Sequence, residues 1–195
     1  MFDLVGVPPS EQEDETRNSG IPVLLFHSVQ PGINNANCIS PSIFSEIIDS
    51  ILENGYWFSD HLIPEKRSED NRKKSIILTF DDAYQSILDH AWPFLSLRKI
   101  PFIIFVPVKY IGKNNLWNTK ANYIEQHLDW RDLVYLSEQN VVIGSHAYSH
   151  HSLVKFNGPK ILQEMMISKE ALEQKLSFSI DYIAYPYGDI NKDVV

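Results

Sequence analysis

Residues 75–82 read Ser-Ile-Ile-Leu-Thr-Phe-Asp-Asp, an apolar run of strand length that ends on two neighbouring carboxylates. The run is too continuous for a strand with one face in water, so it predicts a strand that is buried on both faces. Strands of this kind belong to parallel sheets whose faces are covered by helices. The stretch therefore favours an α/β fold.

Further apolar runs of strand length occur along the chain, and helical patterns separate them. The predicted strands besides 75–80 are residues 21–26, 101–106, 141–144 and 180–185, with a shorter strand at 56–58. The predicted helices are residues 41–55, 83–97, 129–137 and 159–176. Pro93 predicts a kink near Trp92. This alternation of strands and helices favours βα units and a mostly parallel sheet.

Polar or turn-forming residues follow four of the predicted strands. His27, Asp81, His146 and Pro186 stand at or near these strand ends. In parallel α/β folds, catalytic groups collect at the carboxyl ends of the strands. The sequence therefore predicts a functional site at this edge of the sheet.

The acidic pair and a histidine pair together predict a metal site. The two adjacent carboxylates of Asp81 and Asp82 repel each other, and a cation beside them compensates this repulsion. One carboxylate can then act as a metal ligand and the other as a base. His146 and His150 are four residues apart, so on one helical turn both imidazoles reach the same ion. The alternatives are a solvated turn for the aspartates and a surface pair for the histidines. One Asp and two His fit zinc best, with iron, cobalt or nickel as further candidates.

The composition limits the remaining possibilities. The chain has 195 residues, 44% of them hydrophobic, which fits one domain with a proper core. Its net charge of −8 does not favour a nucleic-acid partner. No apolar segment approaches the roughly 18–20 residues of a transmembrane helix. Cys38 is the only cysteine, which excludes a Cys-based zinc site.

His61, His90 and His127 stand in charged or helical contexts, and we expect them on the surface.

Several segments resemble the polysaccharide deacetylase family, also called the NodB-homology domain or carbohydrate esterase family 4. The matching motifs are Thr79-Phe80-Asp81-Asp82-Ala83, Ser145-His146-Ala147-Tyr148-Ser149-His150 and Ala184-Tyr185-Pro186-Tyr187-Gly188. The resemblance covers about residues 21–190 and implies a distorted (β/α) barrel. The number of predicted strands is smaller than this barrel has, so we expect it to be incomplete at the C-terminus.

The resemblance also implies roles for these residues. Asp82, His146 and His150 would bind the metal, and Asp81 would act as the general base. The backbone N–H of Tyr187 would stabilise the oxyanion.

The family's usual late histidine motif is absent from this sequence. The subgroup similar to poly-N-acetylglucosamine deacetylases takes its general acid from the first strand, in a sequence like Phe26-His27-Ser28. His27 is therefore the candidate acid, and the alternative is a histidine held by hydrogen bonds at a strand end.

Two positions depart from the common family pattern. Ala184 stands where many members have an arginine that orients the base, and the first-strand-histidine subgroup often lacks this arginine too. Ala83 replaces a glycine, and we expect this Cβ to be tolerated if φ is negative there.

The expected function is metal-dependent hydrolysis of N-acetyl groups on an amino-sugar polysaccharide or glycoconjugate. One alternative is a catalytically silent carbohydrate-binding or interaction module. Another is a metal hydrolase that acts on a different amide or on an O-acetyl ester.

The first 20 residues differ from the rest of the chain. They carry four acidic residues among Pro, Ser and Asn within residues 8–19, without a basic start or an apolar segment. We therefore expect a solvated leader at 1–20, the deacetylase-like domain at 21–195 and no signal peptide. This favours a cytoplasmic protein, although many similar proteins are exported.

Overall fold

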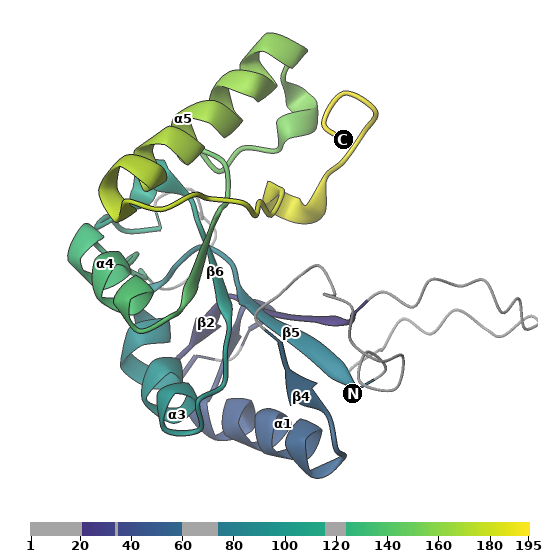
Figure 1. Cartoon of the computed structure of the whole chain (residues 1–195), viewed down its shortest axis with the longest axis vertical. Helices are drawn as coiled ribbons and strands as arrows, with labels where there is room; N and C mark the ends of the chain where they lie inside the picture. Colours follow the sequence, from purple (N-terminus) through teal and green to yellow (C-terminus); the bar gives the residue numbers. More distant parts are fainter. Residues whose placement is uncertain (1–20, 34, 60–73, 116–123) are drawn as a thin grey trace, which may run out of the picture.

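The computed structural model describes residues 21–33, 35–59, 74–115 and 124–195, which form an α/β fold (Figure 1). The predicted leader at 1–20 lies outside the described residues, so the division at residue 20 stays a prediction.

The strands are β1 (Val23–Phe26), β2 (Ser28–Val29), β3 (Cys38–Ile39), β4 (Trp57–Phe58), β5 (Ser75–Phe80), β6 (Ile103–Val106) and β7 (Val142–Ser145). The helices are α1 (Pro41–Glu53), the π-helical turn η1 (Ile87–Ala91), α3 (Trp92–Leu97), α4 (Trp130–Glu138) and α5 (Gly158–Leu176). Short 3₁₀ turns are η2 (Val108–Tyr110), η3 (Leu153–Lys155) and η4 (Pro186–Gly188).

The main sheet is parallel, as predicted, and its strands follow the order β1-β5-β6-β7. β4 pairs with the first residues of β5, while β2 and β3 form a separate two-stranded sheet. Phe26 lies opposite Phe80, and Val106 lies opposite Ser145. The carboxyl ends of the main strands therefore meet at one edge, where the site was expected.

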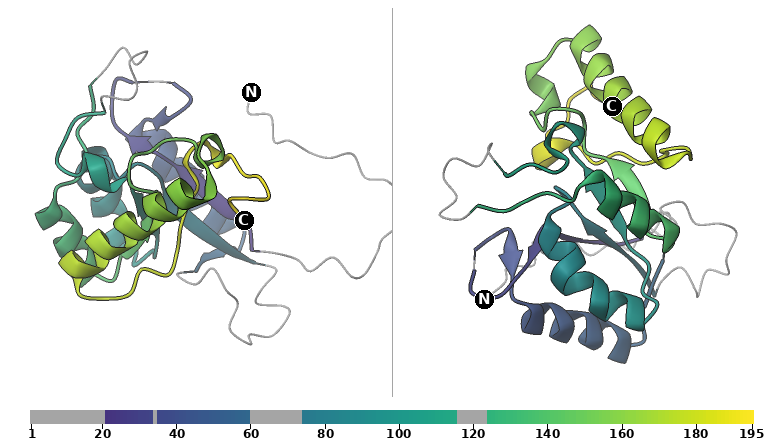
Figure 2. Two further views of the ribbon diagram at one scale, coloured as in Figure 1. Left: turned by 90° about the horizontal axis from the view of Figure 1, so that it is seen from above. Right: turned by 90° about the vertical axis from the view of Figure 1, so that its left-hand side faces the viewer.

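Both faces of the central strands are buried. Leu78 and Phe80 of β5 belong to the main core, which also contains Phe44 and Leu133 from the helices. Ile77 points to the other face, into a smaller apolar cluster with residues of β6. Helices α1, α3 and α4 follow one another along one side of the sheet, and α5 lies beyond β7 (Figures 1 and 2).

Local sequence signals explain the helix boundaries. The Ser40 side chain caps α1, and Asp129 forms a capping box with Asp132 at the start of α4. The predicted kink near Trp92 is confirmed, because the π-helical turn η1 precedes Pro93 and accommodates it. None of the helices in the described part of the chain is long and apolar enough to cross a membrane.

Two strand predictions need correction. In the predicted strand at 180–185, only Ile183 pairs with the sheet, through one bridge to Ser145. β1 is not buried on both faces, because Val23 and Leu25 are 54% and 47% exposed. In the described residues β1 pairs only with β5, so the sheet is open at β1, as predicted for an incomplete barrel.

Candidate metal centre

The turn after β5 carries both aspartates in an unusual backbone conformation. Asp82 and Ala83 have φ angles of 68° and 54°, so two successive residues without glycine occupy the left-handed region. The condition under which we expected the Cβ of Ala83 to be tolerated, a negative φ, is therefore not met. The turn brings both carboxylates to the same histidine: Asp81 Oδ2 lies 3.8 Å and Asp82 Oδ1 lies 3.7 Å from His146 Nε2.

The loop after β7 carries both histidines, and it is not the helical turn that was predicted. Ala147 and His150 have φ angles of 59° and 56°, which interrupt any right-handed helix between His146 and His150. The loop nevertheless brings the two rings together, with their centroids 5.0 Å apart.

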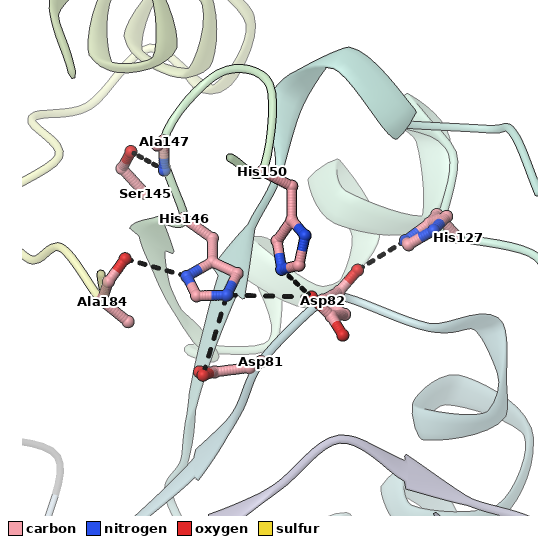
Figure 3. Close-up of polar contacts among 8 residues, drawn as sticks. All are labelled: Asp81, Asp82, His127, Ser145, His146, Ala147, His150 and Ala184. Carbon is pink, nitrogen blue, oxygen red and sulfur yellow. Dashed lines mark hydrogen bonds and ion pairs between the residues drawn. The ribbon is translucent and has the colours of Figure 1, made fainter. Parts of the chain in front are cut away.

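The three predicted metal ligands lie together (Figure 3). One ligand atom each from Asp82, His146 and His150 lies within 4.8 Å of the other two, and all three residues are buried. The closest pair is His150 Nε2 and Asp82 Oδ1, at 2.9 Å. This arrangement matches the donor set of a divalent metal site with open coordination positions.

The hydrogen bonds and protonation states around this group fit a metal ion. His146 Nδ1 donates to the backbone carbonyl of Ala184 at 2.8 Å, because a carbonyl oxygen can only accept. This tautomer leaves Nε2 of His146 as the free lone pair toward the aspartates. Burial lowers the pKa of His146 to about 4, so the ring is neutral near pH 7. Asp82 Oδ1 is buried and faces Nε2 of His150 at 2.9 Å and Nε2 of His146 at 3.7 Å, so one cation could be bound by all three atoms.

The two aspartates differ strongly in acidity in the metal-free molecule. Burial, followed by the charge of Asp82, raises the pKa of Asp81 to about 7. Burial also acts on Asp82, but His150, His146 and His27 outweigh it and lower its pKa to about 2. Environments that separate the pKa values of two neighbouring carboxylates favour different roles for them, here Asp82 as ligand and Asp81 as proton acceptor.

His27 and Tyr187 lie at the rim of this group. His27 follows β1, and burial lowers its pKa. Asp82 raises this pKa by a smaller amount and His150 lowers it further, so His27 lies within electrostatic reach of both. His27 also lines a cavity of about 340 Å³ together with residues of β1, α1 and β3. Tyr187 is 65% exposed, and its ring centroid lies 5.1 Å from that of His150. With a φ of 65°, Tyr187 is the fifth left-handed residue beside the group.

Two buried residues that sequence reasoning missed support these loops. His127 is 1% exposed, so its predicted surface position is wrong; its Nδ1 lies 2.6 Å from the Asp82 carbonyl oxygen. Glu164 of α5 is 3% exposed and accepts from both the N–H and the Oγ–H of Ser149, each at 2.8 Å. Of the other histidines expected on the surface, His90 is half-buried and His61 lies outside the described residues.

Two known proteins are similar to this chain in sequence. The chain is 30% identical over 132 residues to the poly-beta-1,6-N-acetyl-D-glucosamine N-deacetylase of Staphylococcus epidermidis, a match that covers 63% of this chain and 44% of the relative. The chain therefore matches less than half of that relative's length. YxkH of Bacillus subtilis is 24% identical over 202 residues, which cover 97% of this chain and 67% of YxkH.

Solved structures share the fold. IcaB from Ammonifex degensii aligns with a TM-score of 0.73 and 24% identity over 90% of this chain and 77% of its own. The Streptococcus pyogenes deacetylase PplD, in complex with acetate, aligns with a TM-score of 0.72 and 21% identity over the same shares. The sequence profile of the polysaccharide deacetylase family matches residues 68–195, which is more than half of the chain. The chain therefore belongs to the polysaccharide deacetylase family.

Proposed function

We propose that this chain is a metal-dependent hydrolase that removes N-acetyl groups from an amino-sugar polysaccharide. The observation that carries the proposal is the buried group of Asp82, His146 and His150 with the Asp81 carboxylate beside it. The Staphylococcus epidermidis relative supports a polymer of N-acetylglucosamine as the substrate class.

In this proposal Asp82, His146 and His150 hold a divalent cation. Zinc fits one carboxylate and two imidazoles best, with iron, cobalt and nickel as alternatives. The bound ion would supply Lewis acidity to the acetamide carbonyl and to the attacking water. The Ala184 carbonyl keeps His146 in the required tautomer and orientation through its Nδ1 hydrogen bond.

The residues around the ion would move the protons. Asp81, whose pKa lies near 7 before the ion binds, takes a proton from the water that attacks the acetyl carbon. His27 gives a proton to the sugar nitrogen as the C–N bond breaks, because an amide anion cannot leave. The backbone N–H of Tyr187 donates to the oxyanion that forms between these steps. Acetate and the free amine are the products.

An assay of acetate release tests this proposal directly. The zinc-loaded chain is incubated with oligomers of β-1,6-linked N-acetylglucosamine, and acetate is measured over time. Replacing Asp81 with Asn removes the proton acceptor without removing a ligand, so release falls by at least about 100-fold while zinc stays bound. Asp193→Asn, at an exposed position, is the control and keeps the wild-type rate.

The outcomes separate the roles. A near-normal rate in the Asp81→Asn variant would show that the general-base assignment is wrong. Bound zinc without acetate release from any such oligomer would instead favour a catalytically silent carbohydrate-binding module.

A further inference from the structure

The turn after β5 needs an external support, because its backbone conformation is unfavourable. Asp82 and Ala83 both lie in the left-handed region, which residues with a Cβ enter only at a cost. Isolated left-handed residues occur in many loops, but two in succession persist only where the surroundings hold them. The surroundings of this turn are therefore informative about how the candidate ligand Asp82 is placed.

All four residues of one segment, 125–128, contact this turn. From the first residue to the last, these contacts are Ser86 Oγ to Glu125 Oε1 at 2.6 Å, Gln85 N to Gln126 O at 2.7 Å, His127 Nδ1 to Asp82 O at 2.6 Å and Leu128 N to Ala83 O at 2.8 Å. Each residue of the segment thus binds a different residue of the stretch 82–86. These contacts together hold four of the five residues 82–86.

His127 makes the contact closest to the metal group. Its partner is the carbonyl oxygen of Asp82, which can only accept, so Nδ1 of His127 carries the proton and donates. The imidazole is 1% exposed and packs on the ring of Tyr84, with the centroids 4.7 Å apart. Figure 3 shows that His127 approaches Asp82 from the side opposite to His146. Asp82 is thus held at its carbonyl by one histidine, while its carboxylate faces two others.

Glu125 connects the same segment to β2, which begins directly after His27. Its Oε1 accepts from Ser28 at 2.5 Å and from Ser86 at 2.6 Å, and Ser28 directly follows His27. The carboxylate is 4% exposed, so these contacts lie inside the protein. The segment therefore joins the strand end that carries His27 to the turn that carries Asp82.

We propose that residues 125–128 are a clamp that sets the position of Asp82, and that His127 is its positioning residue. The inference rests on the proposed function, because it assigns the clamp to the metal ligand of that site. His127 does not contact the ion or the substrate in this proposal. It acts through the backbone of Asp82, in the way that residues behind metal ligands fix their orientation.

Substitutions at His127 separate the hydrogen bond from the packing. His127→Phe keeps a ring against Tyr84 but removes the donor. His127→Asn places an amide nitrogen where Nδ1 lies and restores the donor, whereas His127→Gln places its amide one bond further out. His90→Phe, in η1, is the control for adding a phenyl ring. Zinc affinity is measured by competition with a chelating dye, at a temperature where circular dichroism shows each variant folded.

The expected result is a loss of zinc affinity by about 10- to 100-fold for His127→Phe and for His127→Gln. The His127→Asn and His90→Phe variants stay within about threefold of wild type, because the donor to Asp82 is present in both. The proposal is overturned if His127→Phe binds zinc as tightly as wild type, or if Asn and Gln weaken it equally. If the Phe variant does not fold, the contrast between Asn and Gln decides alone.

Amide hydrogen exchange of the zinc-free chain tests the clamp without any metal. The amides of Leu128 and Gln85 donate across the clamp, so they exchange faster in His127→Gln than in His127→Asn, while amides of α5 do not change. Equal exchange in the two variants would reject the clamp. If wild type binds no zinc, the proposed function fails, and this exchange comparison still decides the inference.

Discussion

The turn after β5 and the loop after β7 both hold metal-ligand candidates in place, but through different contacts. Both use left-handed residues that are not glycine to aim metal-ligand candidates at one point: Asp82 and Ala83 in the first, Ala147 and His150 in the second. The β5 turn is held at four of the five positions 82–86, and two of these four contacts are main-chain hydrogen bonds. The β7 loop has a main-chain hydrogen bond from Lys109 N to Tyr148 O at 3.0 Å, and the buried side chain of Glu164 accepts twice from Ser149.

This difference predicts that the β5 turn and the β7 loop respond unequally to substitutions. Main-chain hydrogen bonds survive most substitutions, because every residue except proline supplies the same N–H and C=O. A loop that is held partly by a buried carboxylate loses that part of its support when the carboxylate is removed. Removing the Glu164 carboxylate should therefore destabilise the β7 loop more than removing one side chain of the clamp destabilises the β5 turn, although either change weakens zinc binding at the one site.

The largest effect is expected when a ligand is removed from either region. We predict that Asp82→Ala, in the β5 turn, and His146→Ala, in the β7 loop, each lower zinc affinity by more than about 100-fold. The reason is that both supply donors to one ion, and direct ligands contribute more than the residues behind them, whose removal costs about 10- to 100-fold. Metal content after dialysis, measured by elemental analysis, checks this.

His151→Ala is the matched control, because this exposed histidine neighbours His150 but contacts only Ser149 Oγ among the hydrogen bonds of the described residues. It should keep its zinc. If only one of the two ligand variants lost the metal, the two regions would not serve a common ion.

The next effect concerns the support of the β7 loop. We predict that Glu164→Leu lowers the free energy of unfolding by about 1–3 kcal/mol, because the buried N–H of Ser149 loses its acceptor and its hydroxyl keeps only the contact with His151 Nδ1. Zinc affinity falls with it by about 10- to 100-fold, because Ser149 adjoins the ligand His150. Urea unfolding and the chelator competition measure the two quantities.

Glu170→Leu supplies the comparison on the same helix. Glu170 is exposed on α5, so its substitution should change the free energy of unfolding by less than about 0.5 kcal/mol. Equal effects of the two substitutions would mean that the buried carboxylate does not support the loop.

The strands with a continuous apolar pattern were predictable in their positions, although β1 is not buried on both faces as its pattern predicted. β5 has the predicted bounds, residues 75–80. The run at 180–185 is equally apolar, yet only Ile183 pairs with the sheet. Ile180 and Tyr182 instead pack against different apolar clusters. Apolar composition signals burial, and it does not distinguish a buried strand from a buried irregular segment.

The site was predictable in its members but not in its supports. Asp82 and His146 follow parallel strands, whose carboxyl ends must meet, so their proximity follows from topology. His127 contacts a residue 45 positions away through a single hydrogen bond, and no periodic pattern in the sequence signals such a contact. The spacing of His146 and His150 predicted a helical turn, but left-handed residues give the same proximity in a loop.

The smallest effect concerns the strain that the two regions share. A left-handed residue with a Cβ costs roughly 1–2 kcal/mol, which a glycine would relieve. Ala83 and Ala147 are both buried, so Ala→Gly also removes a packed methyl group, which costs about 0.8 kcal/mol. Glycine further increases the freedom of the unfolded chain, at a cost of about 0.5–1 kcal/mol. Since these contributions nearly cancel, we predict that Ala83→Gly and Ala147→Gly each change the free energy of unfolding by less than about 0.5 kcal/mol.

Ser177 at the end of α5 provides the contrast, because its φ is 63° but its side chain is exposed. There the relief of strain is not offset by lost packing, so Ser177→Gly should raise the free energy of unfolding by about 0.5–1 kcal/mol. Urea denaturation of the three variants measures the difference. A gain at Ala83 as large as that at Ser177 would show that the methyl group of Ala83 contributes no packing, and that the β5 turn holds its conformation through the clamp alone.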